Sequence, residues 1–309
     1  MEKYVVGIGA TNVDIYCKSK IEIKEHFDHP SDISYTPGGV TRNILENIHK
    51  LGLDTKLLTC VGDDIYGNYL IERINESGID ASNIDVINGG HTGLFVQVQD
   101  NNNDMHLAMC DMNILKHIDV NYIKKNETVF KNASAIILDP SLDNEILDYL
   151  FETYGDIPIF VDPISDVYAK KIRPYLDRIY CIKPNRSELS VLADMKIDNH
   201  IDLLLAYEKV LDSGVKKVYV SLGGDGCMYN DDENHTYTRA FKPIDKMVNA
   251  SGAGDSFFAA IIYSFVTGQN LDDTIDYALG AGIAAITCEE TINPELSVEL
   301  LKKIIKERK

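Results

Sequence analysis

Residues 249–257 combine small side chains, one carboxylate and the beginning of an apolar run, and this combination could do chemistry. Gly252, Ala253 and Gly254 leave the backbone bare, so several N–H groups can point at one oxygen-rich ligand. The apolar run that begins at Phe257 predicts a buried helix whose positive end faces the same place. The segment therefore predicts a site for an anion such as a phosphoryl group.

Asp255, within this segment, has two interpretations. Aspartate is favoured at the start of a helix, where its carboxylate accepts hydrogen bonds from unpaired backbone N–H groups. Beside an anion-binding turn, the carboxylate could instead take a proton from an alcohol while the amides stabilise the charge that develops on a phosphoryl group. The segment alone leaves both roles open.

Polar residues also follow the first predicted strand, residues 4–9. This strand ends in Gly-Ile-Gly, as in a dinucleotide-binding turn, but a third glycine is missing and Asn12 stands where a helix should begin. The sequence therefore disfavours an NAD site. Asp14 lies in an apolar strand, so it is either a buried carboxylate that needs partners or a rim residue that faces water.

The turn at Gly38 and Gly39 leads into a predicted amphipathic helix over residues 40–51. Glycines without side chains allow another molecule to approach the backbone closely. Asn43, one helical turn later, offers both a donor and an acceptor. Together with Asp14, these residues could bind the adjacent hydroxyl groups of a sugar.

Two further polar turns follow predicted buried strands. Asn185 and Glu188 have the spacing of a capping box, and they could alternatively organise water around a Mg²⁺ ion. The turn after residues 217–221 could simply end a strand, or its bare backbone could lie along a nucleotide. Its candidate nucleotide-binding residues are Ser221, Gly223, Gly224 and Gly226.

Short β-branched runs alternate with amphipathic stretches from about residue 133 onward. Each run is almost continuously apolar, which is typical of a parallel strand covered on both faces. We therefore expect an α/β fold with a doubly wound, mostly parallel sheet and helices on both faces, with the polar residues after each strand at one edge. The runs are residues 135–138, 157–161, 178–182 and 217–221.

Two segments, about 13–37 and 91–113, depart from this rhythm. Their more even alternation of apolar and polar residues is typical of antiparallel strands exposed on one side. We expect them to form a small β-sheet inserted into a single domain, residues 1–309. Such a sheet could act as a lid that excludes water from a phosphoryl-transfer site.

The formal net charge of −18 disfavours nucleic acid and anionic membranes as partners, because both require clustered Lys and Arg. A nucleotide needs only a locally positive pocket. The chain shows no basic leader followed by an apolar run, and its longest apolar stretch, residues 257–266, is too short to span a bilayer. We therefore expect a cytoplasmic protein.

Four sites in this order resemble the ribokinase-like (PfkB) family of sugar and nucleoside kinases, and they cover nearly the whole chain. They are Gly38 and Gly39 with Asn43, Asn185 with Glu188, Gly223 to Gly226, and Gly252-Ala253-Gly254-Asp255. The resemblance implies a Rossmann-like domain with a β-sheet lid, ATP as phosphoryl donor and Mg²⁺ as cofactor.

The same resemblance implies the roles of the site residues. Asp255 would deprotonate the acceptor hydroxyl, and Gly252, Ala253 and Gly254 would form the anion hole. Asp14 would bind the hydroxyls of the sugar beside Gly38, Gly39 and Asn43. Asn185 and Glu188 would serve the network of water around the metal and the phosphates.

Within the family, the chain resembles pseudouridine kinases at residues 38–44, 46–47, 51–52, 108–114 and 161–165. This implies phosphorylation of the 5′-hydroxyl of a ribosyl acceptor, with pseudouridine as the acceptor. Another nucleoside, ribose or another sugar is an alternative acceptor, and a non-catalytic nucleoside-binding protein is a different alternative. A nucleoside hydrolase would need a cluster of carboxylates, and the sequence has no such spacing.

Three finer expectations depend on this resemblance. Polar residues on or beside the lid, Asn12, Asp111 and Asn113, could read the edge of the base. Asn249 stands where many relatives have aspartate, near a place where a monovalent cation often binds, so dependence on K⁺ is left open. By family analogy, the exposed edge of the lid favours a homodimer.

Overall fold

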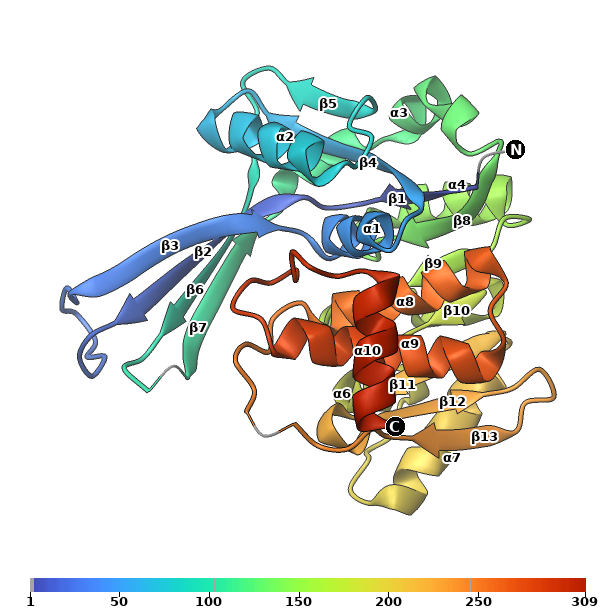
Figure 1. Ribbon diagram of the computed structural model, residues 1–309. Helices are drawn as coiled ribbons and strands as arrows, with labels where there is room; N and C mark the ends of the chain where they lie inside the picture. The colour runs from blue at the N-terminus through green and yellow to red at the C-terminus, as the bar shows by residue number, and fades with distance from the viewer. Residues whose placement is uncertain (1–2, 103, 245) are drawn as a thin grey trace.

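The computed structural model describes residues 3–102, 104–244 and 246–309. The described residues form a main sheet of nine strands in the order β13-β12-β11-β10-β9-β8-β1-β4-β5 (Figure 1). These strands are β1 (Tyr4–Ile8), β4 (Asp54–Gly62), β5 (Ile84–Ile87), β8 (Ala133–Leu138), β9 (Ile159–Val161), β10 (Cys181–Ile182), β11 (Lys217–Ser221), β12 (Cys227–Asn230) and β13 (Thr236–Arg239).

Helices cover both faces of this sheet (Figure 1). One group is α1 (Val40–Lys50), α2 (Ile65–Ser77), α8 (Ala253–Thr267), α9 (Leu271–Ile286) and α10 (Val298–Arg308). The other is α3 (Val120–Lys125), α4 (Asn144–Tyr154), α5 (Asp166–Ile172), α6 (Arg186–Ala193) and α7 (His200–Leu211). Short 3₁₀ helices η1 (Asn113–His117), η2 (Glu127–Val129), η3 (Arg173–Arg178) and η4 (Gly223–Asp225) lie between these elements.

The main sheet is mostly parallel. β1 pairs in parallel with β4 on one side and with β8 on the other, and parallel pairing continues through β9 and β10 to β11. Among the described strands of the main sheet, only β12 and β13, at one edge, pair in an antiparallel manner. The predicted doubly wound sheet is confirmed, and its order changes direction at β1, where such folds place a ligand crevice.

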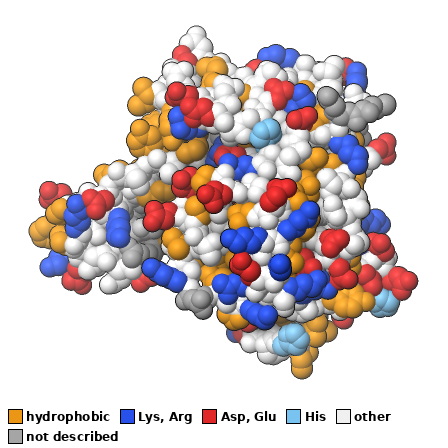
Figure 2. Space-filling view, viewed as in Figure 1, with side chains coloured by type: hydrophobic (Ala, Val, Ile, Leu, Met, Phe, Trp, Pro, Cys, Tyr) orange, Lys and Arg blue, Asp and Glu red, His pale blue; other side chains and the backbone are white. Residues whose placement is uncertain are grey.

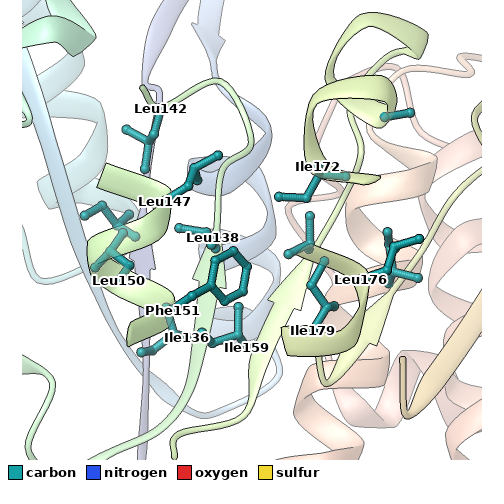
Figure 3. Packing of buried hydrophobic residues seen from close by; sticks show 14 of the residues in the cluster. Ile136, Leu138, Leu142, Leu147, Leu150, Phe151, Ile159, Ile172, Leu176 and Ile179 are labelled. Atoms are coloured by element: carbon teal, nitrogen blue, oxygen red, sulfur yellow. The ribbon is translucent and has the colours of Figure 1, made fainter. Parts of the chain in front are cut away.

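Two hydrophobic clusters, one on each face, hold the layers together. Successive side chains of a strand point to opposite faces, so Val6 and Ile8 of β1 enter one cluster and Val5 enters the other. In the first cluster, side chains of α4 and α5 pack over β8 and β9 (Figure 3). The near-continuous apolar character of the predicted strands follows from this double burial.

A second, smaller sheet projects from the body of the molecule (Figures 1 and 2). The described residues give it the order β3-β2-β6-β7, with β2 (Asn12–Ser19), β3 (Ser31–Gly38), β6 (Gly93–Gln99) and β7 (Met105–Asp111). β2 is antiparallel to β3 and parallel to β6, while β6 is antiparallel to β7. The two expected segments of alternating residues thus form one small β-sheet.

The two faces of the small sheet differ. Asn12, Asp14 and Tyr16 alternate with Val13 and Ile15 along β2, so the two groups lie on opposite faces. Val13 and Ile15 pack with the cluster that contains α1 and α2. Tyr16, on the same face as Asp14, lines a cavity of about 450 Å³ with Asn249 and Ser251, so this face is turned toward the segment before α8. No helix in the described parts of the chain is long and apolar enough to cross a bilayer.

Candidate active site

The small-residue turn forms the beginning of α8. The helix starts at Ala253, four residues before the expected apolar run, so Asp255 lies in its first turn. Gly252 is the N-cap residue with a φ of 75°, and a Cβ there would overlap the carbonyl oxygen of Thr291. Glycine is needed at this position both for its backbone conformation and for its lack of volume. The first amides of a helix have no intrahelical acceptors and can bind an anion.

Asp255 does not cap α8. No side chain caps this helix, and the Asp255 carboxylate instead accepts a hydrogen bond from Asn43 Nδ2 at 2.7 Å. Burial, followed by the nearby Asp162 carboxylate, raises the pKa of Asp255 to about 7, although Asn43, Lys183 and Arg42 act in the opposite direction. A carboxylate with such a pKa can both accept and release a proton at neutral pH.

Asp14 and Asn12 lie beside the paired glycines. Asn12 Nδ2 donates to Asp14 Oδ1 at 2.6 Å, and a Cβ on Gly38 would overlap the Asp14 carboxylate. Gly39 has a φ of 99° and is the N-cap of α1, where a Cβ would overlap the carbonyl oxygen of Ala10. Burial raises the pKa of Asp14, which remains partly accessible to solvent. The two predicted parts of the sugar site are thus adjacent.

α1 connects this turn to Asp255. Asn43 lies one turn into the helix and reaches Asp255 with its amide nitrogen. The neighbouring Arg42 is 2% exposed and donates to the backbone carbonyls of Pro37 and Gly38. Four predicted residues, Asp14, Gly38, Gly39 and Asn43, therefore lie around the same point as Asp255.

Lys183 and Asp162 are site residues that the sequence did not indicate. Each follows a parallel strand, and their side chains form a buried ion pair at 3.1 Å. Lys183 Nζ would lie 3.2 Å from a Cβ on Gly254, so the ammonium lies against the anion-binding turn. Burial lowers the pKa of Lys183, but Asp162, Glu188 and Asp255 outweigh burial and the pKa is raised. Lys183 is therefore a fixed positive charge beside that turn.

Asn185 and Glu188 form the capping box of α6. Glu188 Oε2 accepts from the Asn185 backbone N–H at 2.8 Å, and Asn185 Oδ1 accepts from the Glu188 backbone N–H at 2.9 Å. Burial, followed by Asp162, raises the pKa of Glu188 to about 7. The capping function is present, and it uses one of the two carboxylate oxygens.

The four residues predicted to bind a nucleotide, Ser221, Gly223, Gly224 and Gly226, line a cavity of about 360 Å³. The backbone of Ser221 bridges to that of Asn185, so this turn lies next to the capping box. The cavity extends to Ala253 and Gly254 at the head of α8. Its other walls are mostly apolar and include Phe241, Met247, Phe257, Leu279, Ile283 and Ile286. The arrangement suits a flat apolar group at one end and an anion at the other.

The remaining predicted residues lie at two other places. Asp111 and Asn113 line a cavity of about 530 Å³ with Met112 and Tyr168. Asp111 Oδ1 accepts from Asn113 N at 3.0 Å and from Asn113 Nδ2 at 2.8 Å. Asn249 accepts from the backbone N–H of Ser251 at 2.9 Å and donates to the carbonyl of Glu289 at 3.0 Å.

The chain is similar to known carbohydrate and nucleoside kinases. The family described as pfkB family carbohydrate kinase matches residues 2–297. A pseudouridine kinase of Escherichia coli (strain K12) is 32% identical over 296 residues, which cover 96% of this chain and 94% of that protein.

Two solved structures share the fold. A candidate sugar kinase from Clostridium perfringens has a TM-score of 0.86 and 29% identity, with 100% of this chain and 97% of that chain covered. A candidate ribokinase II from Escherichia coli, in complex with ATP and Mg²⁺, has a TM-score of 0.83 and 20% identity, with 99% and 100% covered. The ribokinase-like fold expected from the sequence is confirmed.

Proposed function

The chain belongs to the pfkB family of carbohydrate kinases, and from this we propose that it transfers the γ-phosphoryl group of ATP to the 5′-hydroxyl of pseudouridine. One observation carries the phosphoryl transfer. The Asp255 carboxylate, with a pKa of about 7, lies at the head of α8, where the backbone amides lack intrahelical acceptors. The choice of pseudouridine is supported by the 32% identical relative.

The 360 Å³ cavity supports ATP as the donor. Adenine would occupy its apolar part between the turn at Gly223, Gly224 and Gly226 and helix α9, with Ser221 at the rim. The phosphates would run toward Gly252, Ala253 and Gly254, where the helix dipole and the Lys183 ammonium stabilise negative charge. A structural neighbour in complex with ATP and Mg²⁺ also supports ATP as the donor.

Mg²⁺ fits the oxygen-bearing side chains on this side of the site. Glu188 is 4% exposed and its capping bond uses only Oε2, so Oε1 and the Asn185 side chain could hold water around the ion. The ion supplies neutralisation of phosphate charge. Removing Mg²⁺ should abolish turnover.

The acceptor would lie between the small sheet and α1. Asp14, Asn12 and the turn at Gly38 and Gly39 would bind the ribose hydroxyls, and Asn43 would lie near the reacting end. Asp255 takes the proton of the 5′-hydroxyl while that oxygen forms a bond to the γ-phosphorus, and the bond to the β–γ bridging oxygen breaks, leaving ADP. Positioning and charge stabilisation supply most of the acceleration in such transfers.

Phe95 supports a nucleoside rather than a free pentose. It pairs with Asp14 across β2 and β6 and with Cys110 across β6 and β7, so all three lie on the acceptor face of the small sheet. Phe95 is partly exposed, and it packs in neither hydrophobic cluster of the described chain. A partly exposed aromatic ring beside a sugar site can stack on a base, and such stacking contributes roughly 1–3 kcal/mol per base.

The edge of the base would be read by Asn12, Asp111 or Asn113. Asp111 and Asn113 line the 530 Å³ cavity next to Cys110, but Asp111 pairs with Leu94 and so lies by register on the face opposite Phe95. Asn12 lies on the acceptor face and is hydrogen-bonded to Asp14. If Asp111→Ala and Asn12→Ala both retain the preference for pseudouridine over uridine, these two side chains do not read the base.

The cation requirement is tested by exchange of K⁺ for Na⁺, since the neutral Asn249 offers no charge to a cation.

The face of the small sheet opposite Asp14, its outer face, supports a homodimer through this sheet. Ile33, Tyr35, Leu107 and Met109 are exposed large apolar residues there, and Met109 is 69% exposed. β3 and β7 are the edges of this sheet in the described chain. A second copy of the chain would cover these residues.

The deciding experiment measures ADP formation with a panel of nucleosides and pentoses, with mass spectrometry of each product. The proposal expects efficient turnover of pseudouridine with phosphate on the 5′ position. Preferred turnover of ribose or another nucleoside would show that pseudouridine is not the acceptor, while the proposed phosphoryl transfer would stand. Binding of nucleosides without any ADP formation would favour a non-catalytic protein.

A further inference from the structure

Arg42 is a buried cation beside the proposed catalytic base. Its side chain is 2% exposed although it lies in the first turn of α1. Burial of a guanidinium is unfavourable unless its donors are satisfied by nearby acceptors. Burial lowers the pKa of Arg42, but Glu46, Asp14 and Asp255 all favour its charged form.

The guanidinium ties the backbone before Gly39 to the helix after it. Nε donates to the carbonyl oxygen of Gly38 at 3.1 Å, and Nη2 donates to that of Pro37 at 2.9 Å. Nη1 forms an ion pair with Glu46 at 2.6 Å, one turn further along α1. The turn at Gly38 and Gly39 is therefore fixed by the hydrogen bonds of a buried side chain.

Arg42 Nη2 also donates to the side-chain oxygen of Asn43. Because arginine has only donors, this contact selects the orientation of the Asn43 amide in which the oxygen faces Arg42. The amide nitrogen must then face away, and it donates to Asp255 Oδ2 at 2.7 Å. We propose that Arg42 is a positioning residue, which fixes the Asn43 amide so that it presents a donor to Asp255. The inference rests on the proposed function of Asp255.

The charged and polar groups around Asp255 give this arrangement a measurable consequence. Asp162 raises the pKa of Asp255, whereas Lys183, Arg42 and the Asn43 amide lower it. Without the guanidinium, the Asn43 amide is free to turn its oxygen toward the carboxylate. Two acceptors that face each other disfavour the ionised carboxylate, so the pKa of Asp255 would rise above its value of about 7.

The test is the pH dependence of kcat/KM for Arg42→Lys. Lysine keeps a positive charge, but one ammonium cannot reproduce the planar fork of donors. The acid limb of the profile should move to higher pH by about 0.5–1 pH unit, which corresponds to a loss of roughly 3- to 10-fold on that limb. The loss should shrink at pH 9. Arg73→Lys is the matched control, since Arg73 pairs with Glu76 on the surface of α2, and it should leave the profile unchanged.

Asn43→Ser separates positioning from general destabilisation. Alone it should move the acid limb in the same direction, and adding Arg42→Lys should move it no further, because both changes act through one amide. An equal loss at every pH, or additive shifts in the double variant, would overturn the inference. If Arg42→Lys does not fold, an unchanged acid limb in Asn43→Ser overturns it as well. Wild-type protein without any kinase activity would instead overturn the proposed function.

Discussion

Asp255 and Glu188 illustrate how burial prepares single residues for this chemistry. Both carboxylates have a pKa raised to about 7, with burial as the largest cause and Asp162 as the next. A base works best when its pKa lies near the working pH. The nearby Lys183 stays charged because three carboxylates surround it. Protonation of Asp255 should therefore set the lower pH limit of activity, with the rate falling as the pH drops below about 7.

Asp255→Asn removes the base and keeps nearly the same shape. Turnover should fall by about 10²–10⁴, the usual contribution of general base catalysis. ATP binding should persist, because the amides at the head of α8 are unchanged. Steady-state kinetics and titration calorimetry with ATP measure the two effects; loss of ATP binding together with turnover would contradict the assignment.

The same substitution should alter stability in a pH-dependent way. An aspartate titrates at about 4 in an unfolded chain, whereas Asp255 titrates at about 7 in the folded protein. The folded state therefore binds the proton more tightly, and this contribution is complete below pH 4 and lost as the pH rises through 7. Asp255→Asn should raise the Tm of the ligand-free protein by roughly 1–4 °C at pH 8 and have little effect at pH 4.5. An equal change at both pH values would show that desolvation of the carboxylate is not the cause.

Asp14→Ala should act on binding of the acceptor more than on the chemical step. In the proposed site, removal of this carboxylate would leave acceptor hydroxyls unpaired, and unpaired polar groups weaken binding strongly. KM for the acceptor should rise by about 10-fold or more while KM for ATP changes little. A fall in kcat alone would place Asp14 in the chemical step instead.

At the scale of elements, the start of α8 shows what the sequence could and could not predict. The apolar run at Phe257 correctly indicated a buried helix, because its side chains enter a hydrophobic cluster. The helix begins earlier, at Ala253, since Gly252 adopts a positive φ that local propensity does not predict. The early start moves Asp255 from a capping position into the first turn.

The two ends of α8 provide a matched pair of glycines. Gly252 and Gly268 both have a φ of 75°, but a Cβ overlaps Thr291 only at Gly252, while Gly268 has open space around it. Gly268→Ala should cost about 1 kcal/mol of stability with kcat retained. Gly252→Ala should reduce kcat at least 10-fold more than Gly268→Ala, because the anion-binding turn must shift. Equal kcat values in the two variants would show that this turn does not contribute to catalysis.

At the scale of the whole molecule, the order of motifs predicted the fold and much of the candidate site. Residues separated by about 200 positions, such as Asn43 and Asp255, meet because the ends of parallel strands and the starts of helices share one edge of the sheet. The ion pair of Lys183 with Asp162 was not predicted, because single polar residues after strands carry no signal of their partners. The role of Arg42 was likewise not predicted, because this residue lies within an ordinary amphipathic helical pattern.

The outer face of the small sheet should control assembly. Met109→Lys places a charge among exposed apolar side chains on the face opposite Asp14. In the proposed homodimer this charge would be buried, so the variant should sediment as a monomer at concentrations where we expect the wild-type protein to dimerise. Lys18→Met, on the acceptor face by register, is the control. A wild-type monomer at all concentrations would refute assembly through this sheet.

The most direct measurement is a crystal structure with pseudouridine and a non-hydrolysable ATP analogue. We expect the 5′-oxygen to lie within about 3.2 Å of the Asp255 carboxylate. We also expect the terminal phosphate to accept hydrogen bonds from the first amides of α8. A 5′-oxygen remote from Asp255, or a terminal phosphate bound away from those amides, would contradict the proposed roles of Asp255 and of this turn.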